Sequence, residues 1–161
     1  MTMMAFHKYF RTIVDGAGHE AQKEGLATFE AQHLLLAIAA AREPTTHHLL
    51  AAVGLDHQTI RDVLDREFQH SLSGAGVSLT AFDLPRPNYA PEHPSPGASA
   101  KLALERSFTS VPRRKDLRPA HLLLGILRAE IGTVPRALAL AGIDQADLTA
   151  RVLEALANHS E

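Results

Sequence analysis

Two histidines that begin nearly identical sequence runs are the residues best suited by type and spacing to catalysis or metal binding. His33 begins the run His-Leu-Leu-Leu-Ala-Ile, and His121 begins the run His-Leu-Leu-Leu-Gly-Ile 88 residues later. A neutral imidazole can ligate a metal, transfer a proton or form a hydrogen bond near a helix start. The additional ligands that a closed metal site requires are not evident beside either histidine. We therefore expect both histidines to be structural, and we expect no metal and no cofactor.

Patterns associated with catalysis or nucleotide binding are absent or misplaced. The sequence has no cysteine, and His-Glu-x-x-His, Gly-x-Ser-x-Gly and Gly-x-x-x-x-Gly-Lys-Ser/Thr do not occur. Residues 16–21 fit a loose dinucleotide-binding pattern, but they lie in a stretch predicted to be helical, and that site needs a preceding strand. No pair of carboxylates stands out as acid and base. The sequence predicts a protein that is not an enzyme.

The two histidines belong to an internal duplication. Aligning the chain with itself at a shift of 88 residues, without a gap, gives eleven identities over 41 positions. The identities include Gly54 and Gly142, each followed two residues later by an aspartate, Asp56 or Asp144. Two copies are too few for an open solenoid. We expect them to pack on each other in a single domain that covers the whole chain.

Composition and charge narrow the class of protein. A chain of 161 residues with 45% hydrophobic residues and a net charge of −2 is ordinary for a soluble globular domain. The apolar runs are too short to cross a membrane, and the N-terminus lacks the apolar core of a signal peptide. We expect a cytoplasmic protein without a membrane partner. The near-neutral charge argues against a nucleic-acid partner, which would require a concentrated basic face.

The spacing of apolar residues predicts an all-α fold of eight helices, arranged as two pseudo-symmetric four-helix repeats, each with one of the two histidines. Repeat one spans 5–70 and repeat two spans 98–159. The connection 71–97 is rich in proline and glycine, so we expect no regular element there. Some of its apolar residues are expected to lie against the domain.

Helix boundaries follow from capping residues and glycines. Thr28 and Thr46 are predicted to begin the second and third helices of repeat one. Gly54 and Gly142 are predicted to end the third helix of each repeat, and an aspartate two residues later is predicted to cap the fourth. The inward residues expected for the fourth helices are Ile60, Val63, Leu64 and Phe68 in repeat one and Leu148, Val152, Leu153 and Leu156 in repeat two.

The sequence resembles the Clp N-terminal domain, the tandem-repeat domain at the front of Clp/Hsp100 unfoldases of the ClpC, ClpA and ClpB type. The paired His-Leu-Leu-Leu runs and the two Gly-x-Asp turns carry the resemblance, together with 99–105, which is similar to a helix that opens a repeat in that family. It covers nearly the whole chain except 71–97. Because a phosphate-binding loop is missing and the chain is short for an AAA+ module, it looks like a free-standing domain without a motor.

The resemblance implies a docking module that receives protein substrates and adaptor proteins for an ATPase ring. It implies that this chain binds protein segments or a Clp ATPase, as an accessory or decoy in ATP-dependent proteolysis. One open alternative is a binder that sequesters small molecules or peptides that target Clp domains. Another is a helix-turn-helix DNA regulator, since 138–156 reads as helix, turn and helix. Its second helix carries only Arg151 as a base, whereas a recognition helix offers several donors.

The expected partner surface is the groove between the repeats near Gln32 and Ala120, together with a neighbouring basic loop. That loop contains Arg113, Arg114, Lys115 and Arg118. In related domains of the ClpC type, a glutamate commonly precedes each repeat histidine, and the two glutamates help to bind phosphorylated arginine. Gln32 and Ala120 stand at those positions here. Because neither supplies a carboxylate for a guanidinium, we expect phosphoarginine binding to be weak or absent.

Overall fold

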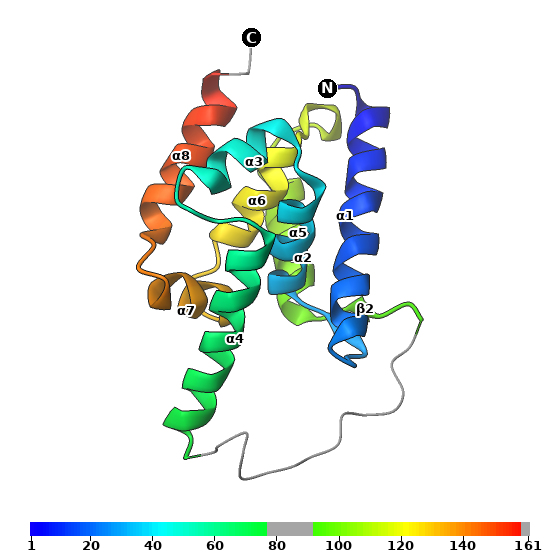
Figure 1. Ribbon diagram of the computed structural model, residues 1–161. Coiled ribbons are helices and arrows are strands. Elements are labelled where there is room, and N and C mark those ends of the chain that lie inside the picture. The colour runs from blue at the N-terminus through cyan, green and yellow to red at the C-terminus, as the bar shows by residue number, and fades with distance from the viewer. Residues whose placement is uncertain (77–91, 159–161) are drawn as a thin grey trace.

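The structure, a computed structural model, describes residues 1–76 and 92–158, and this part of the chain is mainly helical (Figure 1). The described residues contain eight α-helices, as predicted, so the all-α fold class is confirmed. They also contain one 3-10 turn and two strands of two residues. The helices are α1 (Met3–Lys23), α2 (Ala31–Ala41), α3 (Pro44–Ala51), α4 (His57–Gly74), α5 (Ala98–Thr109), α6 (Pro119–Leu127), α7 (Thr133–Leu140) and α8 (Gln145–Asn158); the short elements are β1 (Thr28–Phe29), β2 (Ser95–Pro96) and η1 (Arg114–Asp116).

The two helices that carry the His-Leu-Leu-Leu runs lie at the centre. Every residue of α6 is buried, and so are most residues of α2, which explains why both helices are apolar on all sides. Helix α1 packs on α2, α5 packs on α6, and α4 packs on α7. In Figure 1, α1 and α8 stand on opposite sides of the bundle, with α2, α5 and α6 between them. Buried residues from both repeats form one hydrophobic cluster.

A small residue lets the helices approach closely at two equivalent crossings. A Cβ atom added to Gly16 of α1 would lie 3.1 Å from the Cβ of Ala37 in α2. A Cβ atom added to Gly125 of α6 would overlap the Ser107 hydroxyl and the Ala103 carbonyl oxygen of α5. The α5–α6 crossing therefore leaves no room for any residue larger than glycine at position 125.

The predicted helix starts at Thr28 and Thr46 are wrong. Thr28 lies in β1, whose pairing with β2 is parallel and places it opposite Ser95, and α2 begins at Ala31. Helix α3 begins at Pro44, which suits the first helical position because that residue needs no N–H donor. Glu43 caps this helix, and its carboxylate accepts a hydrogen bond from the Thr46 N–H at 2.9 Å.

The predicted boundary at residue 71 is also displaced, because α4 continues to Gly74, and β2 forms a second regular element within 71–97. The expectation for the connection's apolar residues concerns 77–91, which lies outside the described residues. Phe68 was expected to face inward but is 55% exposed. The inward position on the last turns of α4 belongs instead to Glu67, which is buried and paired with Arg136 of α7 at 2.8 Å.

The turns that precede the fourth helices have the same geometry in both repeats. Gly54 and Gly142 have positive φ angles of 78° and 72°, in the left-handed region that glycine adopts without strain. The Asp56 carboxylate accepts from the Thr59 N–H at 2.8 Å, and the Asp144 carboxylate accepts from the Asp147 N–H at 3.1 Å. Each aspartate therefore satisfies a free donor in the first turn of its helix.

Candidate functional site

Each repeat histidine closes the first turn of its own helix. The Glu30 N–H donates to Nδ1 of His33 at 2.8 Å, and the Arg118 N–H donates to Nδ1 of His121 at 2.9 Å. Both rings are buried. In both repeats the imidazole thus satisfies the backbone donor of the residue that precedes the helix.

The other ring nitrogen of His33 is engaged in an ion-pair network. Its Nε2 lies 3.0 Å from Glu24, and Arg61 of α4 bridges Glu24 at 2.6 Å and Glu20 at 2.7 Å. His57 reaches Glu20 at 2.8 Å. Burial alone would raise the pKa of Glu24, but hydrogen bonds from His33 and Arg61 outweigh burial and lower it. This network closes the surface beside His33 and ties α1 to α4.

The corresponding surface beside His121 is open. Pro112 stands 88 residues after Glu24 and supplies no carboxylate, and no other described residue accepts a hydrogen bond from Nε2 of His121. Burial and the neighbouring charge of Arg118 lower the pKa of His121, so the ring is neutral at pH 7. Because Nδ1 accepts a hydrogen bond, the proton of this neutral ring belongs on Nε2. The ring therefore keeps one N–H donor that has no acceptor among the described residues.

A groove of about 640 Å³ lies beside His121, and we call it the His121 groove. The segment 110–118, helix α6, the end of α8 and Met1 line it. Its volume is in the range of ligand-binding pockets. Leu124 and Leu156 form a buried apolar base, and Leu153, which is 41% exposed, extends that base to the surface. Leu153 was expected to be buried in α8.

Cationic side chains surround this base. Arg113 pairs with Asp116 at 3.2 Å. Arg118 donates to the carbonyl of Leu156 at 2.6 Å, which fixes its guanidinium across the groove. Lys115 and Arg128 also line the groove, and neither forms an ion pair with any residue in 1–76 or 92–158. The His121 groove thus combines apolar surface with several donors of positive charge.

One solved structure identifies the arrangement of the helices. The chain is similar to the N-terminal domain of the caseinolytic protease associated chaperone ClpD from Arabidopsis thaliana, with a TM-score of 0.62, 20% sequence identity and coverage of 90% of each chain. The chain has the Clp N-terminal domain fold. No protein-family model and no curated protein matches the chain.

On this Clp N-terminal domain fold, the residues singled out from the sequence separate into two groups. Arg113, Lys115 and Arg118 meet His121 at the His121 groove. The Arg114 guanidinium instead lies 5.8 Å from the ring centroid of Phe108, where it forms a cation–π contact away from the groove lining.

Gln32 and Ala120 do not reach the His121 groove. Ala120 is buried in α6, and Gln32 is half-buried in α2. Sequence reasoning also missed Arg128 and Leu153 as lining residues. The signal for Leu153 was present, because Leu148, Val152 and Leu156 already form a complete inward stripe at intervals of four residues. The place of Arg128 in the groove lining could not be predicted from the residues next to it in the sequence.

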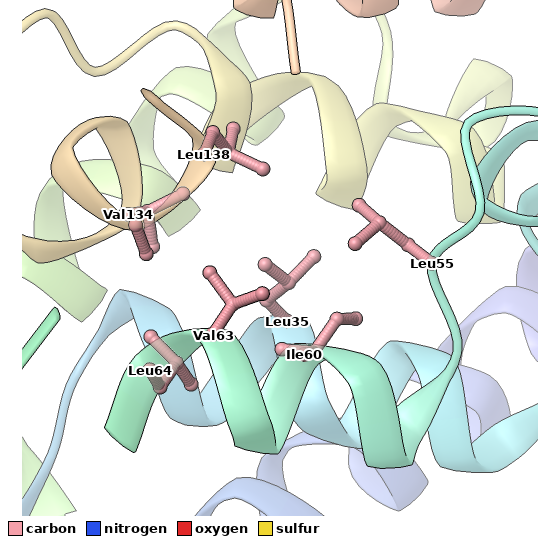
Figure 2. A pocket seen from close by; sticks show the side chains of 8 residues that line it. Leu35, Leu55, Ile60, Val63, Leu64, Val134 and Leu138 are labelled. Carbon is pink, nitrogen blue, oxygen red and sulfur yellow. The ribbon is translucent and has the colours of Figure 1, made fainter. Parts of the chain in front are cut away.

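A second, smaller cavity of the Clp N-terminal domain fold lies between α2, α4 and α7 (Figure 2). Its labelled side chains are all aliphatic and point toward one another, with Leu35 and Val63 on one side and Val134 and Leu138 on the other. Its volume of about 10 Å³ is barely enough for one water, and the lining offers that water no polar partner. This cavity is a packing gap in the core.

The structure also bears on DNA binding, metal binding and membrane insertion. Arg151, the basic residue of α8, pairs with Asp147 at 2.9 Å on the exposed face of that helix. Arg151 is the single basic residue of α8, whereas a recognition helix for DNA offers several donors. Within 1–76 and 92–158, no cluster of three or more His, Asp or Glu residues is arranged to hold a metal ion. None of the helices there is both long and apolar enough to cross a membrane.

Proposed function

We propose that this chain is a non-catalytic docking module that binds segments of other proteins and serves as an accessory or decoy in ATP-dependent proteolysis. The observation that carries this proposal is the His121 groove, an open site with an apolar base and a hydrogen-bonding rim on a Clp N-terminal domain fold. The similar Arabidopsis protein is a chaperone associated with caseinolytic protease. The fold and the groove together favour binding of a protein segment over catalysis.

Binding in such a site needs no covalent step. A few apolar side chains of the bound segment would pack against Leu124, Leu153 and Leu156, while the rim orients the backbone and charged groups. The module then acts only by holding the bound segment in its groove. An accessory protein delivers the segment to an unfoldase, whereas a decoy holds the segment away from it.

Phosphoarginine is not the expected cargo. Gln32 is neutral and Ala120 is buried, so neither position offers a carboxylate to the guanidinium of phosphoarginine. Tight, stoichiometric binding of phosphoarginine in a calorimeter would contradict this part of the proposal.

A reconstituted degradation assay tests the function. The full chain is titrated into a Clp unfoldase and peptidase of the same cell that are degrading a fluorescent substrate. Acceleration would indicate an accessory, and inhibition that excess substrate relieves would indicate a decoy. The variant Leu153→Ser should lose the effect, and the matched variant Leu102→Ser, at another exposed leucine on α5, should keep it. An unchanged degradation rate at every concentration would refute the proposal.

The groove volume also favours one alternative, the capture of a small molecule or short peptide that targets Clp domains. In that case the chain would leave degradation unchanged on its own. It would restore the rate in the presence of such an inhibitor, and Leu153→Ser would abolish the rescue.

A further inference from the structure

The charge of the His121 groove is opposite in sign to that of the whole chain. The chain carries a net charge of −2, yet the part of the groove lining that the structure describes holds four cationic side chains and one carboxylate, that of Asp116. That carboxylate is already paired with Arg113. Lys115 and Arg128 are exposed and have no counter-ion among the described residues. The local field therefore attracts anionic groups.

The base of the same groove selects for apolar side chains. Leu153 is 41% exposed and Met1 is 60% exposed, and both border the buried surface of Leu124 and Leu156. Leu153 and Met1 therefore offer exposed contact area to apolar side chains of a ligand. A ligand that satisfies the whole groove must bring both apolar side chains and negative charge.

We infer that the His121 groove binds an acidic protein segment that carries leucine-like side chains between its carboxylates. The apolar side chains pack on Leu124 and Leu153, and the carboxylates accept hydrogen bonds from Lys115 and Arg128. The Nε2–H of His121, which lacks an acceptor among the described residues, donates to the bound segment. This inference rests on the proposed docking function and specifies the chemistry of its cargo.

The lining distinguishes this cargo from nucleic acid. Single-stranded nucleic acids bind through aromatic platforms on which bases stack, and none of the described residues that line the groove is Phe, Tyr or Trp. The exposed apolar side chains of Leu153 and Met1, which border the base, would gain nothing from a phosphate backbone. A leucine-bearing acidic segment fits both halves of the lining.

Fluorescence polarisation with four labelled peptides of equal length tests the inference on the full chain. The first peptide alternates leucine with glutamate, the second replaces glutamate with lysine, the third replaces leucine with serine, and the fourth replaces glutamate with glutamine. We expect only the first to bind tightly, with an affinity that falls as salt is raised. A labelled oligouridine serves as the nucleic-acid probe.

Two matched pairs of charge reversals locate the site. Lys115→Glu combined with Arg128→Glu should weaken the leucine–glutamate peptide by about tenfold or more, because both rim contacts become repulsive. Arg66→Glu combined with Lys101→Glu makes the same change in net charge at exposed positions of α4 and α5. This control pair should retain the affinity within about twofold. Circular dichroism verifies that both variants are folded.

The results distinguish failure of the acidic-segment inference from failure of the proposed docking function. Unchanged binding in the rim variant, or equal binding of the lysine peptide, overturns the acidic assignment. Tighter binding of oligouridine that the rim variant abolishes also overturns it. If none of the peptides binds while the chain still alters degradation, this inference fails and the docking function stands. If degradation is also unaffected, both fail.

Discussion

Glu30 and Arg118 occupy the same position in the two repeats, 88 residues apart, and they bind helix ends of opposite polarity. The Glu30 carboxylate accepts from the Ser99 N–H at 3.1 Å, at the start of α5. The Arg118 guanidinium donates to the Leu156 carbonyl at 2.6 Å, near the end of α8. A helix start carries partial positive charge and a helix end carries partial negative charge, so each side chain has the complementary sign.

Replacing Glu30 should therefore loosen the contact between repeats. Glu30→Ala removes the acceptor for the Ser99 N–H, and we expect a loss of about 1–2 kcal/mol in the free energy of unfolding, as for other lost caps. Urea denaturation measures the loss. Glu105→Ala on the exposed face of α5 is the control and should change stability by less than about 0.5 kcal/mol. Equal stability of both variants would show that the cap contributes nothing.

Gly125→Ala should be strongly destabilising, by about 1–3 kcal/mol or more, because the added methyl group overlaps Ser107 and Ala103. Adding Ser107→Gly should not restore stability, since the Ala103 carbonyl and the backbone N–H of residue 107 still lie too close. Gly74→Ala, where no atom lies within 4 Å, provides the comparison and should leave stability unchanged or slightly raised, because alanine favours a helix over glycine. Thermal unfolding of the three variants distinguishes backbone crowding from side-chain crowding.

The buried carboxylate of Glu67 joins α4 to α7. Burial would raise the pKa of Glu67, but hydrogen bonds from Arg136 and Ser71 outweigh burial and lower it. Arg136→Ala leaves this carboxylate buried with the Ser71 hydroxyl as its remaining partner, so we expect a loss of about 1–3 kcal/mol. The double variant with Glu67→Gln should recover part of that loss. Additive effects in a double-mutant cycle would mean that the two side chains do not interact.

Acid should weaken the network around Arg61. The pKa values of Glu20 and Glu24 are lowered from 4.5, because hydrogen bonds from histidine and Arg61 outweigh burial. Groups with depressed pKa values stabilise the fold above pH 4.5, and this stabilisation is lost as pH falls through the folded-state pKa values. Arg61→Met should thus lower the melting temperature at pH 7, and its difference from the unchanged chain should narrow toward pH 3. Arg66→Met, on the exposed face of α4, should show no such convergence.

Sequence reasoning succeeded where structure depends on neighbours in the chain. Apolar periodicity predicted the eight helices, and the glycines and aspartates before α4 and α8 have the local geometry that their types favour. It failed where partners come from far away. Thr28 became a strand residue because Ser95 pairs with it, and Phe68 turned outward because Arg136 holds Glu67 inward.

The site was predictable only in part for the same reason. The basic residues of 113–118 form a visible cluster in the sequence. Their meeting with Leu153 and Arg128 requires the end of α8 to lie beside the start of α6, an arrangement fixed by Arg118 and the core rather than by local pattern. Position within a repeat points to Gln32 and Ala120, but the burial of α6 removes Ala120 from the surface.

The closure of the surface beside His33 by Glu24 and Arg61, and the open surface beside His121, set the valency of the proposed module. Within the described residues, a duplicated chain that offers two related surfaces has one of them occupied by its own side chains. A chain with one such surface open binds one segment there at a time, and delivery of that segment to an unfoldase would need a contact outside these two surfaces. Its influence on a partner would therefore scale with its concentration, as expected for a stoichiometric titrant.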